Sequence, residues 1–191
     1  MVSAAAIGQV VLLNGVSSSG KSTLARQLLA DFDTPWFHMG VDMFGAMRAE
    51  AQTHHLDEAS LTEVLRRTRA GFHRAVRAMA LTGNNIVMDH VLSEPWRLAD
   101  LLTVMADVDV VFVGVHCDAA VLIEREVARG DRPVGTAAAQ IAPTHNHGLY
   151  DVEVDTSADD VHECAARIRE YLAHHPAPAV RAFHALRRRR R

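Results

Sequence analysis

The chain has 191 residues, of which 49% are hydrophobic, with a formal net charge of −3 at pH 7 and a mean hydropathy of 0.00. These values fit one globular domain with a substantial core, and no apolar run approaches the ~18 residues that a membrane span needs. Residues 1–180 hold 14 basic and 23 acidic residues, and this acidic balance argues against nucleic acid as the main partner.

The two ends of the chain and its cysteines add three expectations. The N-terminal segment has no basic stretch before its apolar run, which predicts no secretory signal and a cytoplasmic location. Cys117 and Cys164 fall in a strand-like and a helix-like segment, so we expect free thiols. Residues 181–191 carry six arginines and no acid. We therefore predict a single domain over residues 1–175 and a basic, mobile tail over 176–191, with a tether to nucleic acid or membrane as the alternative.

The first predicted element is a buried strand over residues 9–14. After it comes the G-x-x-x-x-G-K-S pattern of a phosphate-binding P-loop, Gly15-Val16-Ser17-Ser18-Ser19-Gly20-Lys21-Ser22. Apolar residues at helical spacing follow, so strand, glycine loop and helix succeed one another as phosphate binding requires. We assign this loop and Thr23 to nucleotide binding, with Lys21 at the β- and γ-phosphates and Ser22 at Mg²⁺. Lys21 is the only lysine among 20 basic residues. An ordinary Ser/Gly turn is the alternative.

A second strand is predicted over residues 34–40. Asp42 follows its carboxyl end, where open parallel sheets bind their ligands. A short helix over 43–52 and a long amphipathic helix over 60–81 come next. Asp42 is a candidate general base beside the P-loop, and the alternative is that it only caps the short helix.

The third predicted strand, residues 85–89, ends in Asp89, a carboxylate placed to orient Mg²⁺ or its water. A purely structural strand-end acid is the alternative. The remaining predicted elements are a helix over 95–106 capped by Ser93, a strand over 109–115, a helix over 118–129, a mobile segment over 133–148, a strand over 151–155 and a helix from a Thr156-Ser157 cap to 173. Five alternations of strand and helix predict an α/β fold, a doubly wound five-stranded parallel sheet.

Two classes of P-loop protein are excluded by what the sequence lacks. A GTPase needs an Asn-Lys-x-Asp motif, but the single lysine already lies in the P-loop, and no Leu-Ser-Gly-Gly-Gln transporter signature occurs. The size, the five strands and the arginines after the fourth strand favour a kinase of small molecules. In this interpretation Arg129 and Arg132 belong to a lid over the triphosphate, and plain surface charges are the alternative.

Histidine pairs suggest a metal site, but none combines with cysteine or acid at a metal-site spacing. We expect structural or exposed histidines. The sequence leaves open whether one of the second pair lines an acceptor pocket. The pairs are His54-His55, His145-x-His147 and His174-His175.

Five segments stand out by their order and spacing over residues 7–172. They are Leu13–Ser22, Gly40-Val41-Asp42, Val113–Asp118, Arg125–Arg132 and Tyr150–Thr156. Together they resemble the chloramphenicol 3-O-phosphotransferase family. The resemblance implies a P-loop kinase that transfers the γ-phosphoryl group of ATP to a hydroxyl of a small molecule, in the antibiotic-modifying member the 3-hydroxyl of chloramphenicol. It implies Asp42 as the base, and we predict Lys21 and Arg132 as further catalytic residues.

The chain departs from the family pattern in two places. His90 stands where the family has a second acid, and residues 45–72, which are expected to shape the acceptor pocket, match poorly. The resemblance therefore supports the use of ATP more strongly than it supports chloramphenicol as the acceptor. A metabolic kinase with another acceptor and a non-catalytic nucleotide-binding protein remain alternatives, and the oligomeric state, a homo-oligomer included, is left open.

Overall fold

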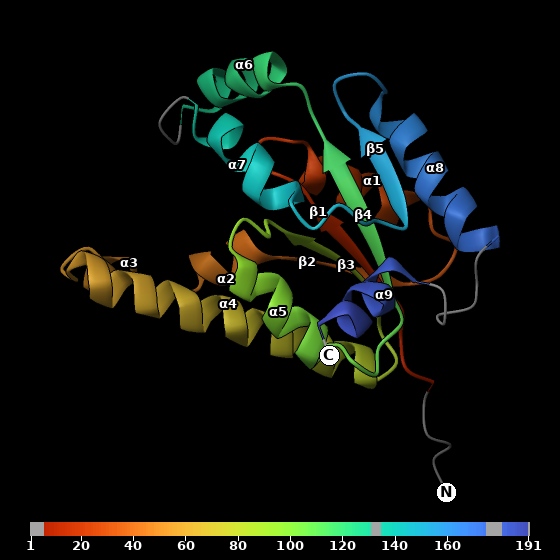
Figure 1. The fold of residues 1–191 in the computed structure, drawn as a ribbon, viewed down its shortest axis with the longest axis horizontal. Coiled ribbons are helices and arrows are strands. Elements are labelled where there is room, and N and C mark those ends of the chain that lie inside the picture. Colours follow the sequence, from red (N-terminus) through yellow and green to blue (C-terminus); the bar gives the residue numbers. More distant parts are fainter. Residues whose placement is uncertain (1–5, 131–134, 175–180, 191) are drawn as a thin grey trace, which may run out of the picture.

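The computed structural model describes residues 6–130, 135–174 and 181–190. Within them, five parallel strands form one sheet in the order β2-β3-β1-β4-β5 (Figure 1). The strands are β1 (Val10–Asn14), β2 (Trp36–Gly40), β3 (Asn85–His90), β4 (Val110–His116) and β5 (Val152–Asp155). The predicted doubly wound, five-stranded parallel sheet is thereby confirmed, with the P-loop strand at its centre.

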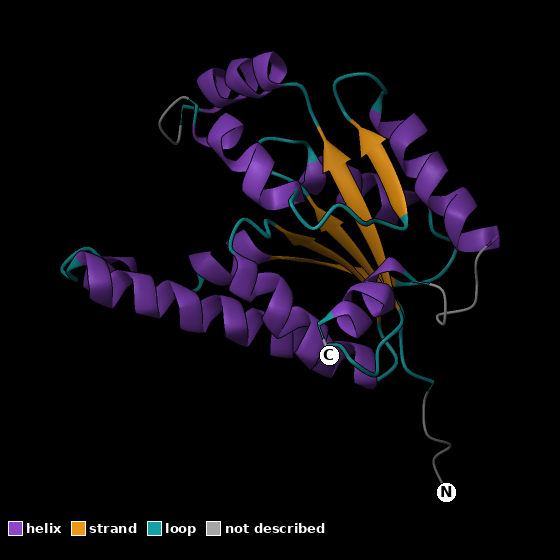
Figure 2. Cartoon of the chain, in the orientation of Figure 1, coloured by secondary structure: helices purple, strands orange, loops and turns teal. Residues whose placement is uncertain are grey.

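Helices cover both faces of this sheet (Figure 2). The helices are α1 (Lys21–Asp31), α2 (Val41–Ala46), α3 (Glu50–Thr53), α4 (Glu58–Leu81), α5 (Pro95–Val104), α6 (Ala119–Arg129), α7 (Thr136–His145), α8 (Val161–His174) and α9 (Ala182–Arg189). One face packs against α1 and α8, and the other against α4, α5 and α9. Among the described residues, no helix is long and apolar enough to span a membrane.

The central strands β1, β3 and β4 are buried on both faces because alternate side chains enter different cores, whereas the edge strand β2 is partly exposed. In β1, Val10 and Leu12 pack with Phe72 of α4, whereas Val11 and Leu13 pack with Leu28 of α1. A strand with helices on both sides has no solvated face, which is why its sequence is apolar throughout.

The segment after α6 differs from the prediction, because residues 136–145 form α7 rather than a mobile loop. The side chain of Glu126 is fully buried at the start of this helix. Its two carboxylate oxygens accept hydrogen bonds from the backbone N–H groups of Gly135 and Ala137, both at 2.8 Å. A carboxylate that pairs with N–H groups at a helix N-terminus satisfies donors that have no partner within the helix. Glu126 therefore orders a segment that has no strong helical pattern of its own.

The prediction of a mobile tail is wrong for residues 181–190, since they include helix α9. Phe183 is fully buried in the core that α4 and α5 form. Arg181 is also buried, and its Nε lies 3.1 Å from Oδ1 of Asp109. The backbone N–H of Ala182 donates to Oδ1 of Asp151 at 2.7 Å. The many arginines suggested a solvated tail, but the segment is an amphipathic helix whose apolar side chains pack into the core on one face of the sheet.

Three helix boundaries also differ from the prediction. The short helix over 43–52 is two helices, α2 and α3. Glu94, not Ser93, is the N-cap of α5. Helix α8 begins four residues after the predicted Thr156-Ser157 cap, because Asp160 accepts from the N–H groups of His162 and Glu163 while Glu163 accepts from the N–H of Asp160. This reciprocal arrangement is a capping box.

Candidate active site

The P-loop connects the end of β1 to the start of α1, and two glycines make its path feasible. A Cβ on Gly15 would lie 2.4 Å from the carbonyl oxygen of Val115 in β4, so only glycine fits there. Gly20, the N-cap of α1, has a φ of 85°, a left-handed conformation that glycine adopts at little cost. The loop therefore places the N-terminus of α1 where phosphate oxygens bind.

Lys21 is buried at the first position of α1. Its Nζ donates to the carbonyl oxygen of Val16 at 2.7 Å and lies 3.9 Å from Oδ1 of Asp89. The ammonium group is thus held at the mouth of the loop, in the position from which a P-loop lysine reaches the β- and γ-phosphates.

Asp89 ends β3 next to the P-loop, as the parallel register dictates. Its side chain is 9% exposed, and Oδ2 accepts a 2.6 Å hydrogen bond from the Ser22 hydroxyl. Burial raises the pKa of this carboxyl, but the contact with His38 and the charge of Lys21 outweigh burial and lower it. An ionised carboxylate beside a serine hydroxyl is an oxygen donor pair that suits Mg²⁺. Ser22 and Asp89, predicted separately from the sequence, are thus brought into contact.

Asp42 lies in the first turn of α2 with an exposed side chain. The N-cap of α2 is Gly40, and the structure records no side-chain capping bond there. The interpretation that Asp42 only caps the helix is therefore wrong. Gly40 is opposite Asp89 in the β2–β3 register, so the chain that follows it brings Asp42 to the same edge of the sheet as the P-loop.

One cavity of about 1030 Å³ joins these groups. Lys21, Ser22, Asp42 and Asp89 all line it, together with Ser17, Ser18, Gly20 and Thr23. One side of the cavity, the nucleotide half, is formed by the P-loop, α6 and the segment after β5. The other side, which we name the acceptor half after the role predicted for it, is lined by α2, α4, Val91, Ser93 and Arg97 of α5.

Two arginines of α6 belong to the nucleotide half, and the sequence analysis predicted one of them. Arg129, predicted as a lid residue, lines the cavity from the last turn of α6. Arg132 lies outside the described residues. Arg125, which precedes Arg129 by one helical turn, was not assigned to the site; it donates to the carbonyl oxygen of Ser18 at 3.3 Å and that of Thr156 at 2.8 Å. The four-residue spacing of two arginines on one helix was the signal that could have found it.

Thr156, which the sequence predicted as part of a helix cap, is a second residue that belongs to this site. Its Oγ1 donates to the carbonyl oxygen of Ser19 at 2.9 Å, and it also lines the cavity. Thr156 thus connects the end of β5 to the P-loop instead of capping a helix.

The loop that follows β3 is held in place by a chain of hydrogen bonds through two buried histidine rings. Nδ1 of His90 accepts from the N–H of Val91 at 2.9 Å, which leaves the ring proton on Nε2. That proton is donated to Nε2 of His73, 2.9 Å away, and His73 Nδ1 donates to Asp100 at 2.7 Å. Burial lowers the pKa of both histidines, so both rings are neutral. The family departure at His90 therefore falls on a buried residue that fixes the loop.

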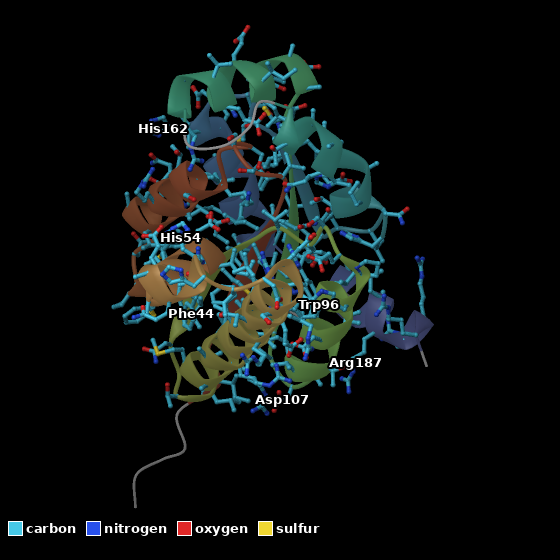
Figure 3. All side chains as sticks on the ribbon, turned by 90° about the vertical axis from the view of Figure 1, so that its left-hand side faces the viewer. Phe44, His54, Trp96, Asp107, His162 and Arg187 are labelled. Atoms are coloured by element: carbon cyan, nitrogen blue, oxygen red, sulfur yellow. The ribbon has the colours of Figure 1, made fainter. Side chains whose placement is uncertain are left out.

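Three of the paired histidines do not line the cavity. His54 faces solvent beside Glu50 at the end of α3 (Figure 3). Nδ1 of His145 lies 2.6 Å from the hydroxyl of Tyr150, which also accepts from Asn14 at 2.7 Å. His147 contacts the same asparagine amide at 3.3 Å. This polar network connects α7 to the strand that precedes the P-loop, which gives His145 and His147 a structural role.

Comparisons with known proteins concern the family of this chain and its fold. The sequence profile of the family described as chloramphenicol phosphotransferase-like protein matches residues 8–173. A Mycobacterium tuberculosis relative, provisionally named an O-phosphotransferase, is 31% identical over 202 residues, which cover 95% of this chain and 89% of the relative.

Solved structures of kinases share the fold. An APS kinase of Mycobacterium tuberculosis in complex with AMPPNP and APS has a TM-score of 0.66 and 16% identity, over 87% of this chain and 98% of that chain. A gluconokinase of Sinorhizobium meliloti has a TM-score of 0.60 and 19% identity, over 89% and 94%. At these identities the likeness concerns the fold, which is that of P-loop kinases.

Proposed function

The chain belongs to the chloramphenicol phosphotransferase-like family, and we propose that it transfers the γ-phosphoryl group of ATP to a hydroxyl of a small molecule. The observation that carries this proposal is the meeting of three groups in one cavity: the P-loop with Lys21, the Ser22–Asp89 pair, and the exposed carboxylate of Asp42. A protein that only binds nucleotide needs the first two groups and has no use for the third.

The nucleotide half binds and neutralises the triphosphate. The loop N–H groups and Lys21 offset phosphate charge, and Arg129 adds a second cation from α6. Ser22 and Asp89 would hold Mg²⁺, which when bound neutralises charge on the phosphate oxygens. Arg125, through Ser18 and Thr156, keeps the loop in its binding conformation.

Asp42 acts on the acceptor. Its carboxylate accepts the proton of the acceptor hydroxyl while the hydroxyl oxygen forms a bond to the γ-phosphorus. The bond between that phosphorus and the bridging oxygen breaks, and its electron pair leaves with ADP. General-base assistance of this kind contributes about 10²–10⁴-fold. An exposed carboxylate that lines the cavity and has no ion pair among the described residues suits this role because the acceptor reaches it directly.

Family membership makes chloramphenicol a first acceptor to test, and inactivation of an antibiotic the corresponding physiological role. Other hydroxyl compounds are equally compatible with the P-loop half. We propose a cytoplasmic location, which the use of ATP and the two free thiols, Cys117 and Cys164, support.

The test is a screen of hydroxyl-bearing antibiotics and metabolites with ATP and Mg²⁺, in which mass spectrometry detects the gain of a phosphoryl group. Lys21→Ala is the control, and we expect it to abolish product while a melting curve confirms that the chain is folded. Full product formation by that variant contradicts the P-loop assignment. If nucleotide binds but no acceptor in the screen is phosphorylated, the chain is a nucleotide-binding protein instead.

A further inference from the structure

The acceptor half of the cavity is strongly cationic. Arg48, Arg69 and Arg97 line it together with Asp42, and the carboxylate of Asp89 lines the same cavity. Helix α4, which carries Arg69, packs against both α2 and α5, as the positions of Phe44 and Trp96 on either side of it illustrate (Figure 3). The site that receives the acceptor therefore has an excess of positive charge next to the proposed base.

Arg69 differs from the other arginines of its helix. Arg66 and Arg67 pair with Glu63, at 2.8 and 3.9 Å. Arg74 and Arg77 pair with aspartates at 3.0 and 2.5 Å. Arg69 is partly buried and, among the residues that the structure describes, has neither a hydrogen bond nor a carboxylate within 4.0 Å. Of the five arginines on α4, the one without an acidic partner is the one that lines the cavity.

Arg97 adds a second guanidinium in the same place, and its side chain is 8% exposed. Nη1 donates to the carbonyl oxygen of Val91 at 2.8 Å and to Ser93 Oγ at 3.2 Å, and Nη2 pairs with Glu94. Its buried Nε has no partner among the described residues. Burial and then the charge of Arg69 lower the pKa of Arg97. Two like charges that repel each other in a partly buried site are stabilised by an anion between them.

The phosphates of ATP do not account for this charge. They are matched in the nucleotide half by the P-loop, Lys21 and Arg129, which come from α1 and α6. Arg69 and Arg97 come from α4 and α5, beside Asp42. A neutral acceptor would leave Arg69 with no carboxylate within 4.0 Å among the described residues, since Glu94, whose carboxylate feels the charge of Arg69, pairs with Arg97 instead.

We infer that the acceptor hydroxyl compound carries an anionic group, a carboxylate or a phosphate, that binds at Arg69 and Arg97 and thereby presents the hydroxyl to Asp42. This inference rests on the proposed phosphotransferase function and names its substrate class. Guanidinium groups bind carboxylate and phosphate through paired, charge-assisted hydrogen bonds.

The first experiment measures anion binding without turnover. The chain is saturated with Mg²⁺ and a non-hydrolysable ATP analogue, so that the P-loop is filled, and inorganic sulfate is titrated by calorimetry. We expect sulfate to bind, and Arg69→Gln to weaken its binding about 10- to 100-fold, the loss typical of a charged hydrogen-bond pair. Arg67→Gln, which removes an exposed charge two residues away on the same helix, leaves sulfate affinity unchanged.

Three results overturn the inference. They are no sulfate binding beside the nucleotide analogue, equal sulfate affinity in Arg69→Gln and the parent, and a large loss of affinity for the nucleotide analogue in Arg69→Gln. The last result would assign Arg69 to the nucleotide. A melting curve of each variant confirms that the fold is intact.

The second experiment separates this inference from the proposed function. Product formation is compared for gluconate against neutral glucitol and for glycerol 3-phosphate against glycerol, which also distinguishes carboxylate from phosphate. We expect the anionic member of a pair to be preferred and Arg69→Gln to raise its KM about 10- to 100-fold. If Arg69 binds sulfate but nothing is phosphorylated, the phosphotransferase proposal fails and the anion site stands. If only neutral compounds react, equally well in Arg69→Gln, the anion site fails and the phosphotransferase stands.

Discussion

Replacement of Asp42 by asparagine or alanine tests the proposed base. The carboxylate is exposed, and the structure records no capping hydrogen bond from it to α2. What it contributes to stability is an acid in the first turn of a six-residue helix, which is worth about 0.3–1 kcal/mol. We therefore expect both variants to lose less than about 1 kcal/mol, a melting shift of about 2–4 °C at most for a chain of this size.

The effect on turnover is expected to be far larger. Neither an amide nor a methyl group accepts the proton of the acceptor, so product formation falls about 10²–10⁴-fold in both variants. That loss corresponds to about 3–5 kcal/mol in the activation barrier. Nucleotide affinity stays the same or rises slightly, because a negative charge in the same cavity as the P-loop is removed.

The assay combines melting temperature, titration with a non-hydrolysable ATP analogue, and product formation for one acceptor found in the screen. Glu50→Gln in α3 is the matched control, since it removes an exposed acid that does not line the cavity. Turnover in Asp42→Asn close to that of the parent would refute the base assignment. A large drop in melting temperature would show that Asp42 has a structural role.

Three further predictions concern residues whose roles follow from their contacts. Phe183→Ala in α9 should lower the free energy of unfolding by about 3–5 kcal/mol, because the ring is fully buried. The control Arg189→Ala, which removes an exposed side chain of the same helix, should change it little. Equal denaturation midpoints for the two variants would mean that α9 contributes nothing to the core. Glu126→Gln should lower the free energy of unfolding by about 1–3 kcal/mol, because one of the two N–H groups that Glu126 binds at the start of α7 loses its acceptor. The control is Glu124→Gln, since Glu124 lies on α6 as Glu126 does. Hydrogen exchange in α7 should rise in Glu126→Gln and not in the control. Asp89→Asn should weaken the Mg²⁺ dependence of nucleotide binding, and identical Mg²⁺ titration curves would show that the acid is structural. Because the pKa of Asp89 is lowered in the folded chain from an ordinary 3.8, its contribution to stability is present at neutral pH and is lost as the pH falls below about 4, and the amide should remove that dependence.

The sheet and its nucleotide half were predictable from the sequence because both depend on local patterns. Apolar runs of strand length that alternate with helical periodicity fix a parallel sheet, since only helices on both faces leave its strands wholly apolar. The Gly15–Ser22 motif encodes a backbone path directly, because its glycines occupy positions where a side chain would collide or be strained. Ser22 and Asp89 were each predicted to hold Mg²⁺, Asp89 because it ends a strand beside the P-loop strand, and the structure brings the two into contact.

The tertiary structure decided what depends on partners distant in sequence. The ordering of α7 comes from a carboxylate on α6, and the packing of α9 comes from Asp109, Asp151 and a core that α4 and α5 form. Composition predicted mobility in both segments because a run of arginines or small residues carries no record of such contacts. The same holds for Arg69: the sequence shows five arginines on one helix, and only the tertiary structure shows which of them lines the cavity with no acid within 4.0 Å among the described residues.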